Sequence, residues 1–160
     1  MQPNTQLPAP DADLRAHPPR AGRDASVAGI VFLARTVDKM RAKLAGTLGP
    51  YKIGPGISMY LFEGLGISEE RFEALVRESK DDAAIAAWMT ANVAREKIDA
   101  VNEMLRKRGI RDADHRAQVL PNYPSIADRP ELSNWLDIFD VDDAWIYDPA
   151  NRGKPGSALN

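Results

Sequence analysis

The sequence predicts an all-α protein, an irregular single-domain bundle of five to six helices. Two observations point to this class. Apolar residues recur at helical spacing in several segments, and most of these segments open on serine, aspartate or asparagine, as helices do. In addition, no two segments alternate in the manner of paired strands. We therefore expect helices packed on helices around one core.

The composition narrows the classes of protein. The chain has 160 residues, 44% hydrophobic and 28% charged, with a net charge of −2 and no cysteine. One domain fits this length. The charge gives no electrostatic footprint for nucleic acid, and no apolar run approaches the ~20 residues that cross a membrane. The absence of cysteine excludes disulfides and cysteine-ligated metals. A cytoplasmic location is expected, because the polar N-terminus lacks the apolar core of a secretory signal.

Three parts of the chain differ in character. Residues 1–24 are rich in proline and poor in large apolar groups, which predicts an extended or disordered N-terminal arm. Residues 25–148 form the predicted helical domain. Residues 149–160 are expected to be a loose C-terminal tail.

The helical domain is predicted to be organised around the segment 27–51, the longest helical pattern of the chain. Asp24 or Ser26 can cap its first amides, and Gly46 is placed to end it. At 100° per residue the aliphatic side chains of this segment share one broad arc. We therefore expect a helix with one face in the core.

Charged residues of this segment fall inside its apolar arc as well as opposite to it. Arg41 lies in the middle of the arc, and Asp38 lies at its edge, so that the two side chains can meet. Arg35, Lys39 and Lys43 point the other way, toward water. Because an unpaired buried charge costs several kcal/mol or more, Arg41 needs a partner.

Two interpretations of Arg41 stay open. In the first, Arg41 forms a structural ion pair with Asp38, or lays its stem on the core with its head in water. In the second, the bundle leaves a polar pocket in which Arg41 clamps an anion and Asp38 acts as acid or base.

Shorter helices follow the central one. A short apolar run at 59–62 has Ser58 as its candidate N-cap, and Ser68 opens a second helix with Phe72 on its buried face. Asp81 or Asp82 starts a third helix.

A single helix from there to residue 109 is not expected, because its two apolar faces are turned about 140° from one another. We therefore place a break near Asn92, which can cap the second half. On that half Arg95–Asp99 and Glu103–Lys107 are i,i+4 ion pairs. Asn102 lies on the apolar edge, where it is expected to bond a loop carbonyl, with a ligand contact as the alternative.

Residues 110–130 are polar and irregular, which predicts a segment that wraps a surface or lines a site. His115 follows two aspartates, but the spacing does not converge on a helix face and makes a metal site a weak interpretation. A last amphipathic helix is predicted around Trp135 and Phe139. Residues 141–147 alternate weakly and are compatible with extended chain.

Four carboxylates gather near the C-terminus, and they repel one another unless something compensates them: Asp137, Asp140, Asp142 and Asp143. An EF-hand does not fit, since the loop from Asp140 lacks the central glycine and ends at Asn151. Calcium or magnesium on two or three of these oxygens is one alternative. The more economical hypothesis is that one carboxylate pairs with Arg35 or Arg41.

Part of the sequence resembles a bacterial family known as domain of unknown function 5069. The resemblance lies in the segment FLARTVDKMRAKLAGTLGPY and in the later Leu65-Gly66-Ile67. The matching positions are Arg35, Asp38, Lys39, Arg41, Gly46, Thr47, Leu48, Gly49 and Tyr51. The stretch from Trp135 to Asp143 is similar to the C-terminal end of the family, so the resemblance covers roughly residues 13–143. Residues 52–58 depart from the polar turn expected there. The resemblance implies a fold and no activity.

The leading hypothesis is a polar pocket between the segment 27–51 and the Trp135 helix. It would bind a small anionic or carbonyl-bearing compound and, in its stronger form, convert it without an organic cofactor or a metal. Asp38 would be the acid or base, Arg41 the clamp and Tyr51 a hydrogen-bond donor. Further ligand contacts are assigned to Arg35, Lys39, Tyr60, Trp135, Asp137 and Asp140.

The alternative is a non-catalytic helical module that binds another protein or a second copy of the chain, so homodimerisation is left open. In that case Phe32, Trp88 and Trp135 would be the anchors, and the charges would supply specificity.

Overall fold

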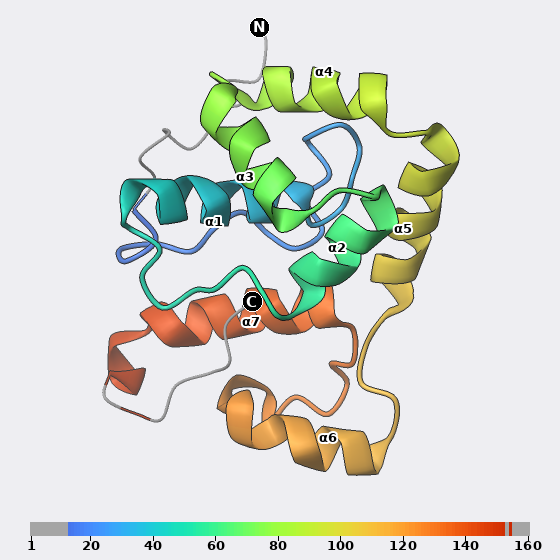
Figure 1. The fold of residues 1–160 in the computed structure, drawn as a ribbon. Coiled ribbons are helices and arrows are strands. Elements are labelled where there is room, and N and C mark those ends of the chain that lie inside the picture. The colour runs from blue at the N-terminus through green and yellow to red at the C-terminus, as the bar shows by residue number, and fades with distance from the viewer. Residues whose placement is uncertain (1–12, 153, 155–160) are drawn as a thin grey trace, which may run out of the picture.

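Helix α1 (Leu33–Ala45) lies between helices of both halves of the chain in the computed structural model (Figure 1). The structure describes residues 13–152 and residue 154. Every residue from Leu33 to Ala42 is buried, because α3 covers α1 on one side and α7 runs along the other (Figure 1). The remaining helices are α2 (Ile57–Leu65), α3 (Glu69–Glu78), α4 (Asp82–Asn92), α5 (Arg95–Lys107), α6 (Ala113–Val119) and α7 (Trp135–Tyr147).

The all-α prediction is confirmed, with seven helices in the described residues rather than five or six. Three short 3-10 turns supplement them at Leu120–Asn122, Pro124–Ile126 and Pro149–Asn151. The described chain has no strand, only one isolated antiparallel bridge between Gly109 and Asn134. None of its helices is long and apolar enough to cross a membrane.

The central helix begins later than predicted. Residues 27–32 form turns, and Phe32 occupies the N-cap position of α1 with φ +68°, so neither Asp24 nor Ser26 caps the helix. Asn102, 71 residues after Val31, keeps these residues from joining the helix. The Asn102 side chain accepts a bond from the Val31 N–H (2.9 Å) and donates to the Gly29 carbonyl (2.8 Å). Asn102 thus satisfies backbone groups that a helix would otherwise use, as expected for its bond to a loop carbonyl.

The predicted caps of α3 and α4 are confirmed. Ser68 accepts a bond from the third residue of α3, and Asp81 does the same for α4. The break near residue 92 is also confirmed, but Asn92 ends α4 and donates to the Trp88 carbonyl instead of capping α5. Ser58 does not cap α2, because the helix starts one residue earlier and Ser58 turns inward.

Two helical stretches were missed in the C-terminal half. Helix α6 has only seven residues and little apolar periodicity, so the sequence predicted irregular chain there. Asp112 caps this helix by accepting a bond from the His115 N–H. Helix α7 continues through residues 141–147, whose weak alternation was also compatible with extended chain. The carboxylates on this stretch have partners in the folded protein, which the sequence pattern did not reveal.

The N-terminal segment contacts the ends of the helices it passes. The part of the predicted arm that the structure describes, residues 13–24, carries Leu14, which is fully buried. The Leu14 N–H donates to the Thr47 carbonyl (3.1 Å), and the Tyr147 hydroxyl donates to the Leu14 carbonyl. This segment therefore joins the end of α1 to the end of α7.

We expect Asn102→Ala to destabilise the protein by about 2–4 kcal/mol, because it leaves a buried N–H and a carbonyl without partners. Glu103→Ala, at the exposed neighbouring position, is the control and should leave the midpoint of urea unfolding nearly unchanged. Equal midpoints for the two variants would show that the 27–32 turns hold without Asn102.

Candidate functional site

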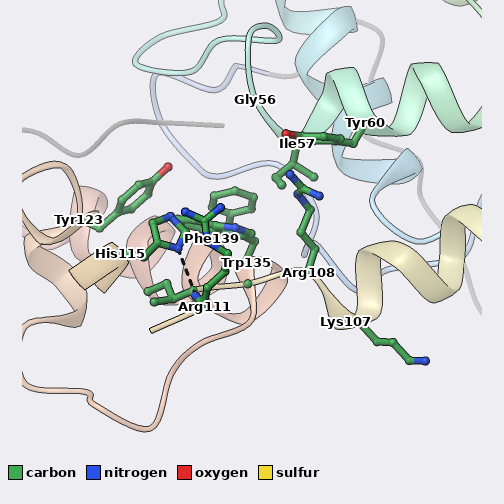
Figure 2. A pocket seen from close by; sticks show the side chains of 12 residues that line it. Gly56, Ile57, Tyr60, Lys107, Arg108, Arg111, His115, Tyr123, Trp135 and Phe139 are labelled. Carbon is green, nitrogen blue, oxygen red and sulfur yellow. Dashed lines mark hydrogen bonds between the residues drawn. The ribbon is translucent and has the colours of Figure 1, made fainter. Parts of the chain in front are cut away.

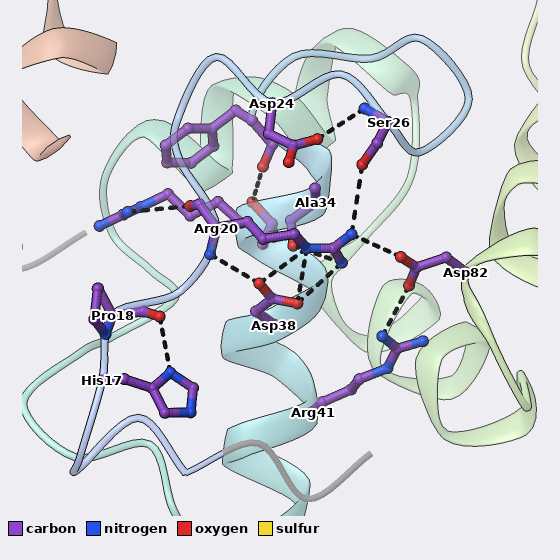
Figure 3. A network of polar contacts seen from close by, with 12 residues as sticks. His17, Pro18, Arg20, Asp24, Ser26, Ala34, Asp38, Arg41 and Asp82 are labelled. Carbon is purple, nitrogen blue, oxygen red and sulfur yellow. Dashed lines mark hydrogen bonds and ion pairs between the residues drawn. The ribbon is translucent and has the colours of Figure 1, made fainter. Parts of the chain in front are cut away.

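One buried charge network joins the N-terminal segment, α1 and α4 (Figure 3). The Arg20 guanidinium donates to Asp38 from Nε (3.0 Å) and Nη2 (2.9 Å), and the Arg20 N–H adds a third bond (2.8 Å). Arg20 Nη1 also contacts Asp82 Oδ2 at 2.7 Å. On the other side of Asp82, Arg41 Nη1 lies 2.8 Å from Oδ1. The order is therefore Asp38–Arg20–Asp82–Arg41.

This network corrects the predicted Asp38–Arg41 pair. Arg41 is drawn inward as expected and is only 5% exposed, but its partner is Asp82 at the start of α4. Asp38 instead faces Arg20, which the N-terminal segment brings alongside α1. Burial raises the pKa of the Asp38 carboxyl, and the bonds from Arg20 partly offset that rise. Asp38 and Arg41 thus belong to one network without touching each other.

A second buried network joins α1 to α7. Arg35 forms a bidentate ion pair with Asp143, at 2.6 and 2.9 Å, and the Tyr51 hydroxyl donates to the same carboxylate at 2.7 Å. The guanidinium lies within 6.0 Å of the ring centroids of Phe32, Tyr51 and Phe139. The hypothesis that an acidic side chain from the C-terminal cluster pairs with an arginine of the central helix is confirmed.

The expectation that Arg35 and Lys39 point toward water is wrong. Arg35 is 1% exposed because it lies against Asp143 of α7 and the Arg20 carbonyl. Lys39 is fully buried against Lys52 and Ser58. Lys43, near the end of α1, is exposed as predicted.

Each carboxylate of the C-terminal cluster has a partner of its own. Asp137 pairs with Arg23 at the surface (2.7 Å), Asp140 accepts from the Gly22 N–H (3.1 Å), and Asp142 accepts from Ser125 (2.7 Å). The repulsion within the cluster is therefore offset one residue at a time. Among the described residues no three metal-binding side chains come together.

Lys39 is a buried amine held by two neutral acceptors. Its Nζ donates to the Lys52 carbonyl (3.1 Å) and to Ser58 Oγ (3.2 Å), and it lies 5.4 Å from the centre of the Phe32 ring. No carboxylate in the described part of the chain forms an ion pair with it. Burial, reinforced by the nearby Arg35 charge, lowers the pKa of Lys39 well below its ordinary value.

A pocket of about 600 Å³ opens at the N-terminal end of α7, the end opposite to Asp143. Its walls come from the start of α2 at Gly56 and Ile57, from the connection between α5 and α6, and from the first turn of α7. Arg108 and Arg111 supply positive charge, and none of the described residues that line the pocket is acidic. The Lys107 amine pairs with Glu103 at 2.7 Å.

Aromatic rings form much of the remaining wall (Figure 2). Trp135 lies 5.9 Å from Phe139 and 5.6 Å from Tyr123, measured between ring centroids, and His115 approaches it edge-on at 6.2 Å. Tyr60 lies elsewhere on the wall, with the Arg108 guanidinium 3.6 Å from its ring centroid.

Backbone contacts hold the charged part of the wall in place. Trp135 N–H donates to the Arg108 carbonyl (3.2 Å), and Ile110 N–H donates to the Ser133 carbonyl (2.7 Å). Gly109 lies between these two bonds. It is so close to the backbone of Ser133 that an added Cβ would lie 2.1 Å from the Ser133 oxygen. Glycine is therefore required at 109 by space.

The predicted site residues are divided among these places. Tyr60 and Trp135 line the pocket, whereas Asp38, Arg41 and Tyr51 do not. Of the pocket's polar residues, Arg108 and Arg111 were missed, and His115 was considered only as a metal ligand. The basic run around residues 106–111 was a signal, but the aromatic residues Tyr60 and Trp135 of the same wall lie at least 24 positions away from it in the sequence.

Comparison with known proteins identifies the family of the chain. The family model described as domain of unknown function (DUF5069) matches residues 16–145. No curated protein matches the chain. The matched range includes both charge networks and every residue named above as lining the pocket.

We expect Asp143→Leu to lower the free energy of unfolding by about 3–5 kcal/mol, because Arg35 would keep a buried charge without a partner. The double variant Arg35→Met/Asp143→Leu should recover most of that loss. Asp137→Leu is a matched control on the same helix: it breaks a solvent-exposed pair and should cost no more than about 1 kcal/mol. The measurement is urea unfolding, and equal losses for Asp143→Leu and Asp137→Leu would contradict the assigned importance of the buried pair.

Lys39 should make the stability of the protein depend on pH. The unfolded chain keeps the lysine proton up to about pH 10.5, whereas the folded protein releases it at lower pH. The unfolded state therefore binds more protons in that window, and the free energy of unfolding should rise with pH by up to about 1.4 kcal/mol per unit.

Urea unfolding between pH 7 and 9.5 measures this slope below the titration of tyrosine. We expect Lys39→Met to remove most of it, and Lys80→Met, at an exposed position, to keep it. If Lys39→Met shows the same dependence of the unfolding free energy on pH as the parent protein, groups other than Lys39 cause it.

Proposed function

Since the chain belongs to the family of domain of unknown function (DUF5069), whose description names no activity, we propose a function from its pocket: the protein binds a small organic anion between α2, the α5–α6 connection and α7. The observation that carries this proposal is the charge of the wall. Arg108 and Arg111 line the pocket without an ion-pair partner among the described residues, and no described lining residue is acidic. The third basic residue, Lys107, pairs with Glu103 (2.7 Å) and points away from the pocket (Figure 2).

This charge pattern differs from the rest of the protein. The chain as a whole has a net charge of −2, and the buried arginines of α1 are matched by Asp143 and Asp82. Arg108 and Arg111 have no such partner among the described residues. A ligand that brings negative charge would replace water at these guanidinium groups with charge-assisted hydrogen bonds.

The volume of the pocket supports a small molecule as the occupant. About 600 Å³ lies within the range of clefts that take metabolites and drug-sized compounds. The wall also combines apolar area with a few polar groups, which is typical of such sites.

The proposal is one of binding, because the residues predicted to carry acid–base chemistry are engaged elsewhere. Asp38 accepts hydrogen bonds from three nitrogens of Arg20, and the Tyr51 hydroxyl donates to Asp143. That these residues convert the ligand by acid–base chemistry stays a prediction from the sequence. A cytoplasmic setting belongs to the same proposal and is in keeping with a sequence without cysteine.

The alternative, an interaction module, receives less support. Phe32 is fully buried in the core and is not available as an anchor. Trp88 is half-buried with the Arg71 guanidinium 5.0 Å from its ring, and Trp135 lines the pocket.

Binding is tested with aliphatic dicarboxylates, aromatic carboxylates and sugar phosphates, followed by amide NMR. We expect shifts for at least one class at Gly56, Ile57, Gly109 and Ile110. Arg108→Gln/Arg111→Gln should weaken that binding by about tenfold or more, because each lost charge-assisted bond contributes about 1.5–3 kcal/mol.

Arg77→Gln/Arg95→Gln is the matched control, since it changes the net charge equally at two exposed positions outside the pocket. It should leave the affinity nearly unchanged. Shifts that map elsewhere, or equal losses in the two double variants, would refute the pocket as the anion site.

A further inference from the structure

We propose that the ligand is a planar aromatic carboxylate, whose ring stacks against the aromatic wall while its carboxylate reaches the basic groups. This inference rests on the proposed function and names the class of anion. Its basis is the separation of two kinds of surface around one pocket, flat aromatic faces and nitrogen donors.

The aromatic part of the wall lies on two sides of the pocket. Figure 2 draws Tyr60 with Arg108 on one side, and His115, Trp135 and Tyr123 across from them. The Arg108 guanidinium lies flat enough on Tyr60 to come within 3.6 Å of the ring centroid. A guanidinium held in this way presents a planar surface of its own, on which a second ring can stack.

Trp135 supplies the opposite surface. It is half-buried, and it is held by Phe139 at an interplanar angle of 24° and by His115 at 69°. Its neighbours fix the orientation of the indole before any ligand arrives. A planar ring therefore gains contact area without paying to order the side chains it meets.

The polar part of the wall favours a carboxylate. His115 Nδ1 accepts a bond from the Arg111 backbone N–H at 3.1 Å, so in the neutral imidazole the proton is on Nε2. This tautomer makes Nε2 a hydrogen-bond donor. Together with the Arg111 guanidinium it offers donors, and a carboxylate offers only acceptors.

A matched trio of test ligands separates the ring from the charge. The aromatic anion is 2-naphthoate, 2-naphthamide is its neutral counterpart, and decahydro-2-naphthoate is an anion with a saturated skeleton. We expect 2-naphthoate to bind at least tenfold more tightly than either of the others, as measured by calorimetry and located by amide NMR shifts at Gly109 and Ile110.

The outcomes distinguish this inference from the proposed function. If decahydro-2-naphthoate binds in the pocket as tightly as 2-naphthoate, the aromatic requirement is overturned and anion binding stands. If 2-naphthamide binds as tightly as 2-naphthoate, charge is irrelevant and both proposals fail. If none of the three binds in the pocket, the aromatic class is overturned, and anion binding is decided by the wider ligand panel.

A variant tests the ring that holds the Arg108 guanidinium flat. Tyr60 is 38% exposed, so Tyr60→Leu should fold, and it should reduce the preference for 2-naphthoate over decahydro-2-naphthoate by at least threefold. Met59→Leu, at the adjacent exposed position, should keep the preference of the parent. An unchanged preference in Tyr60→Leu would overturn the two-sided stacking.

Discussion

The ion pair between Arg35 and Asp143 is the interaction on which the arrangement of the helices depends. It is buried at both ends and bidentate, and it joins α1 to α7. Two charges in a dry interior are stable only in one geometry, so this pair fixes how α1 and α7 lie together. Tyr51 adds a bond to the same carboxylate and brings the turn that follows α1 into the arrangement.

Local rules recovered much of the fold from sequence. Ser68 and Asp81 cap the helices they were expected to cap, and the change of apolar face near residue 92 marks a real break. These features depend on residues three or four positions apart. The start of α1 depends on Asn102 instead, and no local pattern reveals a bond between residues 31 and 102.

The charged residues show the same division. The sequence indicated that Arg41 is buried and that a carboxylate of the C-terminal cluster reaches α1, since buried charge needs a partner. It did not identify Arg20 as the partner of Asp38, and it placed Lys39 in water. The pocket was harder still to predict, because Tyr60, Arg108 and Trp135 come from three separate elements whose meeting is a property of the tertiary fold.

Helix α7 serves both the core and the pocket. Trp135 and Phe139 line the cavity from its first two turns, and Asp143 holds Arg35 about 12 Å further along the axis. Because α7 is a continuous helix, a displacement of its first turns also shifts the turn that carries Asp143. For a ligand of the proposed kind, occupancy of the cavity would therefore be thermodynamically linked to the Arg35–Asp143 ion pair, and a substitution that loosens this pair would also change the geometry of the pocket wall.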